Sequence, residues 1–396
     1  MTQDISPEIA GSIATGLLML QIPATLVLLS RLLRGPGRLP PLMPKTATPE
    51  QLGATSVVVP TLNEAERIGP CLEGLSRQGC EVREIVVVDS RSTDGTPDLV
   101  RAMQHRDPRF RVIEDDPLPP GWVGRPWALH WGFHASSPKS QWFLGIDADT
   151  QPRPGLVASL LDVAETQGFD LISLAPQFVL EYPGEWWLQP ALLVTLIFRS
   201  QPAGADALIP ERVMANGQCF LCRRRILEEL DGYSSAAASF CDDVTLARNI
   251  AARGYRVGFL DGARVFGVRM YLGAVETWRE WGRSLDLKDA AQPGQVWGDL
   301  WLLSCVQALP LLASIILSLL WVTARVPSVT AALGINLGLL AMRFALLLAI
   351  APSYTGSGPW RSLAFWLSPL ADLPAVIRIL LSALRRPKKW RGRAYG

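Results

Sequence analysis

The stretch WFLGIDAD, residues 142–149, decides the expected fold of this chain. Its run of apolar and small residues ends at Asp147 and Asp149, which one alanine separates. A continuous apolar run of this length is typical of a strand buried on both faces of a parallel sheet. Ligands of open α/β sheets bind beyond the carboxyl ends of the strands. The two carboxylates therefore stand where a ligand is expected.

Three further runs of the same kind occur at residues 56–59, 84–88 and 171–174. The first two are β-branched, and each precedes a polar turn and then apolar residues at helical spacing. Strands that alternate with helices predict an α/β domain with a Rossmann-like, mostly parallel sheet. We expect this domain to span residues 51–270.

The composition indicates that membrane segments accompany this domain. Of 396 residues, 49% are hydrophobic and 19% are charged, and the mean hydropathy is +0.20. That balance is too apolar for an ordinary soluble protein and too charged for one that lies wholly in a bilayer. The formal net charge of +2 favours no nucleic-acid partner.

Four apolar stretches are candidates for the membrane: residues 9–33, 300–324, 329–351 and 360–384. The first lacks a small-residue cleavage site and precedes basic residues, so we expect an uncleaved anchor. The positive-inside tendency then predicts an external N-terminus and a cytosolic α/β domain. We expect an integral protein of a bacterial inner membrane.

The last apolar stretch, 360–384, contains Pro369, Asp372 and Pro374, which predict a re-entrant or tilted hairpin and a cytosolic basic tail. Arg343 lies inside the preceding stretch, where a charge is costly and often functional; the alternatives are that it pairs with Asp372 or snorkels. The expected division is an anchor and linker at 1–50, the α/β domain, an interfacial segment at 271–298, and membrane helices with the tail at 299–396. Residues 186–198 are apolar but short, and fit either a buried helix or a helix in the membrane plane.

Polar side chains also follow the first two expected strands. Pro60 and Glu64 come after the first, and Asp89 ends the second. A carboxylate at the position of Asp89 can accept hydrogen bonds from a base or a ribose. Acidic and hydroxyl residues after a strand are also ordinary helix caps, so neither motif is specific alone.

Asp147 and Asp149 suit a hard divalent cation, Mg²⁺ or Mn²⁺. Such ions take one or two carboxylates and fill the remaining positions with water and phosphate oxygens. An ion held there would neutralise a leaving diphosphate by Lewis-acid chemistry. The pair gains its specificity from following two other strand-end motifs in order.

The succession of these motifs resembles the family 2 inverting glycosyltransferases of the GT-A fold. It consists of Pro60 and Glu64, Asp89 with Asp94 and Gly95, Gly124 and Arg125, Asp147 and Asp149, and Asp242 and Asp243. The loop PPGWVGRPWALH, residues 119–130, resembles the carotenoid- and hopanoid-associated branch of that family. The resemblance implies an α/β GT-A catalytic domain flanked by transmembrane helices.

The resemblance also implies roles for donor-side residues. Pro60 and Glu64 match positions that line the nucleotide site, and Asp89 matches the uracil-binding aspartate. Asp149 is the expected direct metal ligand, with Asp147 beside it and also facing the donor. Arg125 stands where the family usually has lysine, and a cation there can hold the donor diphosphate.

For the acceptor side, the resemblance assigns the catalytic base to Asp243, with Asp242 as the alternative because it replaces the usual glutamate. Inversion needs one ionised carboxylate within reach of the acceptor hydroxyl. Gly217 and Gln218 match the acceptor-side glycine motif.

Trp281 and Arg283 are the remaining acceptor-side candidates. The stretch ETWREW, residues 276–281, departs from the Gln-x-x-Arg-Trp motif of processive synthases, which puts polymer extrusion in doubt. Trp281 could stack on a sugar or a polyene, or could anchor a helix at the bilayer surface.

We therefore expect a hexosyltransferase that moves glucose from a UDP-sugar to the hydroxyl of a lipid-soluble acceptor, in the first place a carotenoid. The alternative acceptors are a hopanoid, a sphingolipid-like lipid and a polyprenyl phosphate. The alternative activities are a processive polysaccharide synthase and a nucleotide-sugar-binding protein without turnover.

Overall fold

The computed structural model describes residues 6–200, 202–205, 209–281, 285, 287, 289–323, 325–356, 361–384, 389–390 and 393–394. The chain divides into two compact units. The sheet unit comprises residues 37–179, 203–270 and 388–396, and the helical unit comprises residues 1–36, 180–202 and 271–387. Residues 180–202 of the expected 51–270 domain thus fall in the helical unit. Each unit is described by itself below.

The sheet unit is built on a seven-stranded mixed sheet in the part of the chain that the structure describes. Its order is β3 (Phe110–Glu114), β2 (Val82–Asp89), β1 (Thr55–Thr61), β4 (Trp142–Ile146), β8 (Cys219–Arg223), β6 (Leu171–Ala175) and β9 (Val257–Asp261). The pairs of β8 with β4 and β6 are antiparallel, and the other described pairs are parallel. The four expected strands and the mostly parallel sheet are confirmed.

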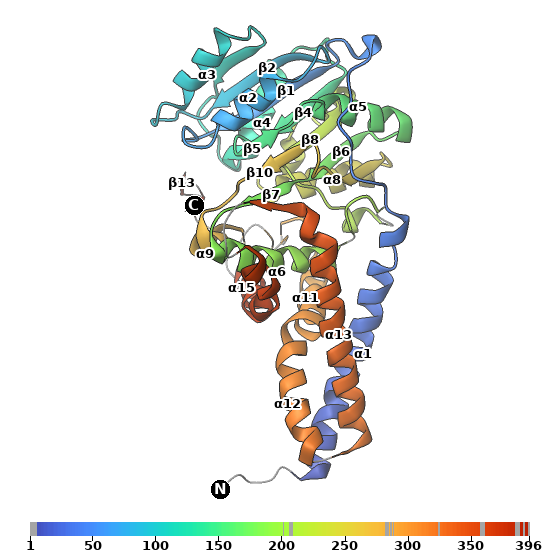
Figure 1. Cartoon of the computed structure of the whole chain (residues 1–396). Coiled ribbons are helices and arrows are strands. Elements are labelled where there is room, and N and C mark those ends of the chain that lie inside the picture. The colour runs from blue at the N-terminus through green and yellow to red at the C-terminus, as the bar shows by residue number, and fades with distance from the viewer. Residues whose placement is uncertain are drawn as a thin grey trace. The chain divides into compact units, whose positions relative to one another are not determined.

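The order of β3, β2, β1 and β4 creates a topological switch point. The chain proceeds from β1 outward to β3 and then returns to place β4 on the other side of β1. Crevices at such points, beyond the carboxyl ends of the strands, are where α/β sheets bind ligands. Figure 1 shows β1, β2 and β4 side by side.

Helices bury both faces of this sheet, which explains the continuous apolar runs. They are α2 (Gly69–Ser76), α3 (Thr96–Gln104), α4 (Gly124–Ala135), α5 (Leu156–Gln167), α7 (Arg224–Glu229) and α8 (Asp242–Ala252). Val57 and Val59 of β1 belong to the core that α2, α3 and α5 share, whereas Val58 belongs to the core shared with α4, α7 and α8. Successive strand residues point to opposite faces, so a strand covered on both sides must be apolar throughout.

A smaller sheet supports the loop after β4. Its strand β5 (Thr150–Pro152) pairs antiparallel with β10 (Phe266–Val268), which pairs parallel with β7 (Gln177–Leu180). β5 starts directly after Asp149, and the Arg269 N–H donates to the Asp149 carbonyl at 3.4 Å. Short elements complete the sheet unit: the 3-10 turns Pro49–Gln51, Pro210–Arg212 and Ser234–Ala236, and the paired strands β12 (Lys389–Trp390) and β13 (Arg393–Ala394).

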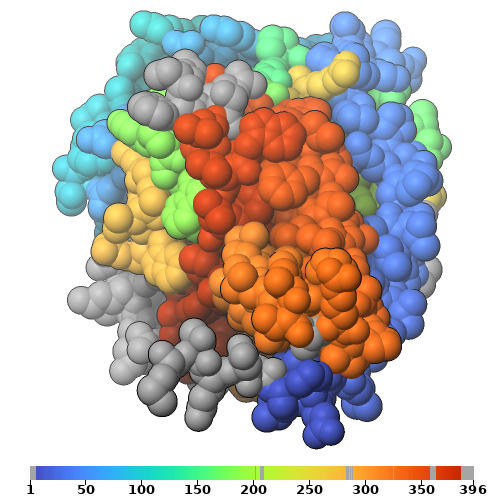
Figure 2. Space-filling view, turned by 60° about the horizontal axis from the view of Figure 1, so that its bottom comes forward, coloured from blue at the N-terminus to red at the C-terminus, as the bar shows by residue number. Residues whose placement is uncertain are grey.

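In the helical unit, three helical segments among the described residues are long and apolar enough to cross a membrane: Pro7–Gly37, Pro293–Thr323 and Pro327–Ser353. They contain α1 (Pro7–Leu32), α11 (Pro293–Leu303), the π-helical Ser304–Ala308, α12 (Leu309–Thr323) and α13 (Pro327–Ile350). Figure 1 shows α1, α12 and α13 running alongside one another. In Figure 2 the first turns of α1, in dark blue, lie against the orange helices.

The remaining elements of the helical unit are shorter. They are α6 (Pro183–Arg199), α9 (Gly273–Glu276), the π-helical Thr277–Trp281, β11 (Tyr354–Gly356), α14 (Arg361–Trp366), the 3-10 turn Ser368–Ala371 and α15 (Asp372–Leu384). The fourth apolar stretch is therefore broken at Pro369, because proline interrupts helical hydrogen bonding. The helix α6 is largely buried, which favours the buried-helix interpretation of residues 186–198.

The long helices expose large apolar side chains and bury a pair of polar ones among apolar neighbours. Leu26, Leu319 and Leu348 are each more than 60% exposed. By contrast, Gln21 of α1 and Asn336 of α13 are fully buried and exchange amide hydrogen bonds of 2.9 and 2.8 Å. Apolar surface outside and side-chain hydrogen bonds between helices inside are typical of a protein that lipid surrounds.

A buried ion pair connects α13 to α15. The Arg343 Nε and Nη2 groups donate to Asp372 Oδ2 at 2.8 Å and Oδ1 at 3.0 Å. Gln307 Nε2 donates to the same Oδ1 at 3.0 Å, and Arg343 Nη2 reaches Ser368 Oγ at 3.3 Å. Of the alternatives for Arg343, pairing with Asp372 is confirmed.

Candidate active site

The first part of the site lies at the ends of β1 and β2. Thr61 and Asp89 are partners in the register of these strands. The Asp89 carboxylate accepts hydrogen bonds from Ser92 N and Oγ at 2.8 and 2.6 Å and from Thr61 Oγ1 at 3.1 Å. These donors hold the buried carboxylate in one orientation at the mouth of the switch point.

Pro60 and Glu64 lie next to it, as the sequence predicts. Pro60 is the penultimate residue of β1, and Glu64 follows in the turn. Glu64 is buried, and its N–H donates to Thr96 Oγ1 at 2.9 Å, which fastens this turn to the start of α3. The expected nucleotide-side residues are therefore grouped at one edge of the sheet.

Asp147 and Asp149 follow β4, on the other side of β1. The Asp147 N–H donates to the Gln218 carbonyl at 3.2 Å, and the Asp147 carbonyl accepts from Thr150 Oγ1 at 2.7 Å. These backbone bonds fix the path of the Asp-Ala-Asp turn between β4 and β5.

The carboxylates of this turn fit a divalent cation. Burial, with a further contribution from Asp147, raises the pKa of Asp149 to about 7. Two carboxylates close together in a half-buried turn repel each other, and a bound cation relieves that cost by favouring the ionised form. An all-oxygen donor set matches Mg²⁺ or Mn²⁺.

Arg125, at the start of α4, is the centre of the site. Its Nε donates to Asp147 Oδ1 at 2.9 Å, its Nη1 donates to Asp242 Oδ2, and its Nη2 donates to the Gly217 carbonyl at 2.6 Å. Burial would lower the pKa of this guanidinium, but Asp147 and Asp242 outweigh burial and raise it. The side chain therefore stays charged and connects the Asp147–Asp149 turn to the acidic pair Asp242 and Asp243.

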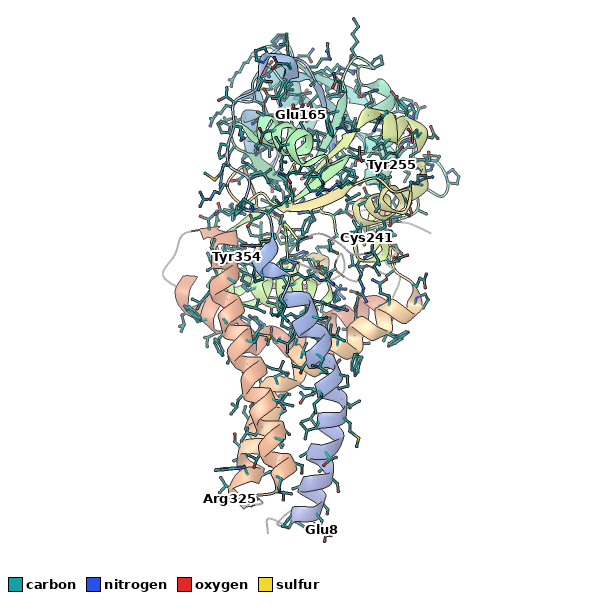
Figure 3. The ribbon with its side chains drawn as sticks, turned by 90° about the vertical axis from the view of Figure 1, so that its right-hand side faces the viewer. Glu8, Glu165, Cys241, Tyr255, Arg325 and Tyr354 are labelled. Carbon is teal, nitrogen blue, oxygen red and sulfur yellow. The ribbon has the colours of Figure 1, made fainter. Side chains whose placement is uncertain are left out.

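The acidic pair lies at the first turn of α8, directly after Cys241, which Figure 3 labels. Asp242 is buried, and the Asp243 Oδ2 atom accepts from the Gly217 N–H at 2.6 Å. Burial raises the pKa of Asp242 to about 7 and also raises the pKa of Asp243, against the opposing effect of Arg125. Asp242 accepts a hydrogen bond from Arg125, whereas Asp243 is less buried. Asp243 is therefore the more accessible candidate for the base.

Gly217 and Gln218 close the site from the other direction, just before β8. An added Cβ at Gly217 would lie 2.5 Å from Arg125 Nη2, so glycine is needed for the guanidinium to approach. The Gln218 side chain is buried and accepts from Asn216 Nδ2 at 3.0 Å. Gly217 thus contacts Arg125, and Gln218 contacts Asp147, whereas their acceptor-side role stays a prediction.

Tyr233 also belongs to this site, although the sequence gives no signal for it. Its ring is 1% exposed, and its Oη has no hydrogen-bond partner among the described residues. It lies 3.4 Å from where a Cβ on Gly145 would be, and Arg125 influences its ionisation. Only the folded chain brings this phenol within electrostatic reach of the guanidinium.

Two expected acceptor-side residues are not part of this grouping. Trp281 belongs to the helical unit, where it is 4% exposed and faces Tyr271 with ring centroids 6.4 Å apart. Arg283 lies outside the described residues. Their acceptor-side roles stay predictions.

Comparison with known proteins finds glycosyltransferases. Residues 56–231 match the model of glycosyl transferase family 2. A 4,4'-diaponeurosporenoate glycosyltransferase from Staphylococcus haemolyticus (strain JCSC1435) is 24% identical over 260 residues, which cover 65% of this chain and 68% of that relative.

Among solved structures, a mannosyltransferase from Pyrobaculum calidifontis in complex with GDP-Man and Mn²⁺ is similar at a TM-score of 0.53. The match is 20% identical and covers 95% of this chain and 99% of that chain. This similarity shows the fold. The expected α/β GT-A architecture, accompanied by long apolar helices, is confirmed.

Proposed function

Residues 56–231 form a glycosyl transferase family 2 domain and the chain is a glycosyltransferase; on this premise we propose that it transfers glucose from a UDP-sugar to the hydroxyl of a membrane lipid, with inversion at the anomeric carbon. The acceptor we propose first is a carotenoid. The observation that carries the proposal is the contact of Arg125 with both Asp147 and Asp242. It joins the residues expected to hold the donor to those expected to act on the acceptor.

Asp243 acts as the base in this mechanism. Its carboxylate takes the proton of the acceptor hydroxyl while that oxygen bonds to the anomeric carbon. The bond between this carbon and the diphosphate oxygen breaks in the same displacement, and its electron pair leaves with UDP. The Gly217 N–H, which donates to Asp243 Oδ2 at 2.6 Å, keeps the carboxylate oriented toward the acceptor.

Arg125 stabilises the negative charge that develops on the leaving diphosphate. A guanidinium presents several N–H groups in one plane, which suits the oxygens of a diphosphate. When bound, a divalent cation at Asp149 and Asp147 supplies Lewis-acid stabilisation of the leaving diphosphate. Asp89 and Glu64 hold the nucleoside at the ends of the neighbouring strands.

The helical unit supports a lipid-soluble acceptor. It provides three candidate membrane spans among the described residues, and the curated relative is named for a carotenoid acid. Figure 3 shows Glu8 and Arg325 at the same end of the helical unit, so α1 and α13 start on one side of a bilayer. We propose that this side is external and that the sheet unit is cytosolic at a bacterial cell membrane.

A second candidate acceptor follows from the name of the relative. 4,4'-Diaponeurosporenoate is a carboxylate. A carboxylate is already ionised at neutral pH, so it needs no base to attack the anomeric carbon. The dependence of transfer on Asp243 therefore separates an alcohol acceptor from an acid acceptor.

The test uses the full chain in detergent micelles with radiolabelled UDP-glucose. The acceptors are a hydroxycarotenoid, a carotenoid acid, a hopanoid alcohol, a ceramide and a polyprenyl phosphate. The expected result is label in an organic-soluble product with the hydroxycarotenoid, in the β configuration by NMR. Label that stays at the origin of a thin-layer plate would indicate a polysaccharide synthase, and binding without product would indicate a protein without turnover.

Matched variants test the base. Asp243→Asn should lower kcat with the alcohol roughly 100-fold or more, whereas with the carotenoid acid it should lower kcat far less. Asp98→Asn, which removes an exposed carboxylate from the first turn of α3, is the control and should leave kcat unchanged. Equal turnover by wild type and Asp243→Asn with the alcohol would disprove the role of Asp243.

A further inference from the structure

A second cluster of potential metal ligands lies on the sheet unit, away from the acidic site. His130, His134 and Asp231 each offer a ligand atom, and these atoms lie within 4.8 Å of one another. The two histidines are one turn apart on α4, a spacing that places both rings on one helix face. The whole chain has three histidines, so two of them are gathered here.

The two imidazoles are close together. Their ring centroids are 4.5 Å apart, and His134 Nε2 lies 3.5 Å from Asp231 Oδ1. The Nδ1 atom of His130 is buried, and this imidazole interacts with the backbone of Asp231. That interaction holds the ring beside the turn that carries the Asp231 carboxylate.

The turn after α7 fixes the orientation of Asp231 beside the two histidines. It has a left-handed backbone with φ of 52°, and its Oδ2 accepts from Ser234 Oγ at 2.8 Å. That bond leaves Oδ1 turned toward His134. The carboxylate is therefore positioned by its own turn, without the histidines.

We propose that His130, His134 and Asp231 bind a transition-metal ion of the Zn²⁺ class, at a site separate from Asp147 and Asp149. Two imidazoles and one carboxylate are a typical ligand set for Zn²⁺, with water completing the tetrahedron. Mg²⁺ and Mn²⁺ prefer all-oxygen sets, so the two sites select different ions. His134 and Asp231 are exposed, which gives an ion direct access.

An ion at this site would fasten two segments that also build the active centre. The helix α4 carries Arg125 in its first turn, and Asp231 is two residues before Tyr233, whose ionisation that guanidinium influences. A bound ion would tie α4 to the turn at residues 231–233. We therefore expect Zn²⁺ to raise the thermal stability of the protein whether or not donor is present.

The test is a titration of the purified full chain with Zn²⁺ in detergent, with millimolar Mg²⁺ present to occupy the acidic site. Isothermal calorimetry should give one Zn²⁺ equivalent with micromolar or tighter affinity. Cu²⁺ added to a second sample should give an electron paramagnetic resonance spectrum with nitrogen hyperfine lines, because imidazole and not carboxylate supplies nitrogen.

The variants are His134→Ala and Asp231→Asn. Both positions are exposed, and asparagine tolerates the left-handed backbone at 231, so both should fold. His134→Ala should weaken Zn²⁺ binding at least about 100-fold and remove the nitrogen lines, and Asp231→Asn should weaken binding about 10-fold. His105→Ala, which removes the third histidine, is the matched control and should bind as wild type does.

Zn²⁺ binding that is unchanged in His134→Ala would overturn the proposal, as would wild type that takes up no Zn²⁺ in the presence of Mg²⁺. Equal loss in His105→Ala would assign the ion elsewhere and would also overturn it. None of these readouts depends on sugar transfer, so the proposal stands or fails apart from the proposed function.

Discussion

Arg125 Nε lies 2.9 Å from Asp147 Oδ1, so the start of α4 meets the carboxylate that follows β4. The same guanidinium reaches Asp242 and the Gly217 carbonyl. One cation thus serves three segments that are far apart in the sequence. Its fork geometry, and not its charge alone, makes this possible.

Replacement of Arg125 by lysine tests that geometry. A lysine ammonium keeps the charge but cannot reach three acceptors in different directions, so one or two charge-assisted hydrogen bonds are lost. Each is worth about 1.5–3 kcal/mol, so kcat/KM should fall at least roughly 10-fold. The measurement is transfer rate against UDP-glucose concentration, with Arg91→Lys in the exposed Arg91–Glu114 pair as control. Wild-type kcat/KM in Arg125→Lys would contradict the role of the fork.

The pH dependence of transfer reports on Asp243. Burial raises the pKa of this carboxyl above the ordinary value of about 3.9. A base must be ionised, so activity is complete above the raised pKa and is lost as the pH falls through it. The acid limb of kcat against pH should therefore lie clearly above pH 4. A limb at or below the ordinary value would show that a different, more exposed group limits the reaction.

Removal of divalent cations should abolish transfer to an alcohol. The expected result is loss of activity in excess EDTA and recovery on addition of Mg²⁺ or Mn²⁺. Asp149→Asn should raise the Mg²⁺ concentration for half-maximal rate at least about tenfold, because a ligand is lost. Asp162→Asn, in the surface pair with Lys45, is the control and should keep the wild-type requirement. Full activity of the wild type in EDTA would exclude this cation site.

The Arg343–Asp372 pair should matter for the stability of the helical unit. Arg343→Met leaves the Asp372 carboxylate buried without its cation, which costs about 3–5 kcal/mol. The double variant with Asp372→Leu should recover most of this loss, since no charge then stays buried. The measurement is thermal unfolding in detergent, and Arg101→Met in an exposed pair should change little. A double variant no more stable than Arg343→Met would contradict the pairing.

Much of the sheet follows from the sequence because its central strands are buried on both faces. The continuous apolar runs at residues 56–59 and 142–146 are typical of buried strands, and they lie in β1 and β4. β3 is different: its residues 110–114 include two arginine or glutamate side chains at the edge of the sheet and give no continuous apolar run. Edge strands lack the signal that double burial imposes.

The candidate site could be predicted as a set of residues but not as a network. Strand-end positions indicate Asp89 and Asp147, because the carboxyl ends of parallel strands meet at one edge. No pattern indicates that Arg125 pairs with Asp242, or that Tyr233 lies within electrostatic reach of both. Similarly, the spacing of His130 and His134 is visible in the sequence, whereas the approach of Asp231 depends on the fold.

The reversed strand β8 has a consequence for how this enzyme can change. It enters the sheet at the edge where β1, β2 and β4 leave it, since it pairs antiparallel with β4. Gly217 therefore reaches the shared site from a segment that leads into β8, whereas Asp89 and Asp147 follow the ends of β2 and β4. Because the Gly217 carbonyl accepts from Arg125 and the Gln218 carbonyl accepts from the Asp147 N–H, a change in the segment before β8 would also disturb the donor-side residues.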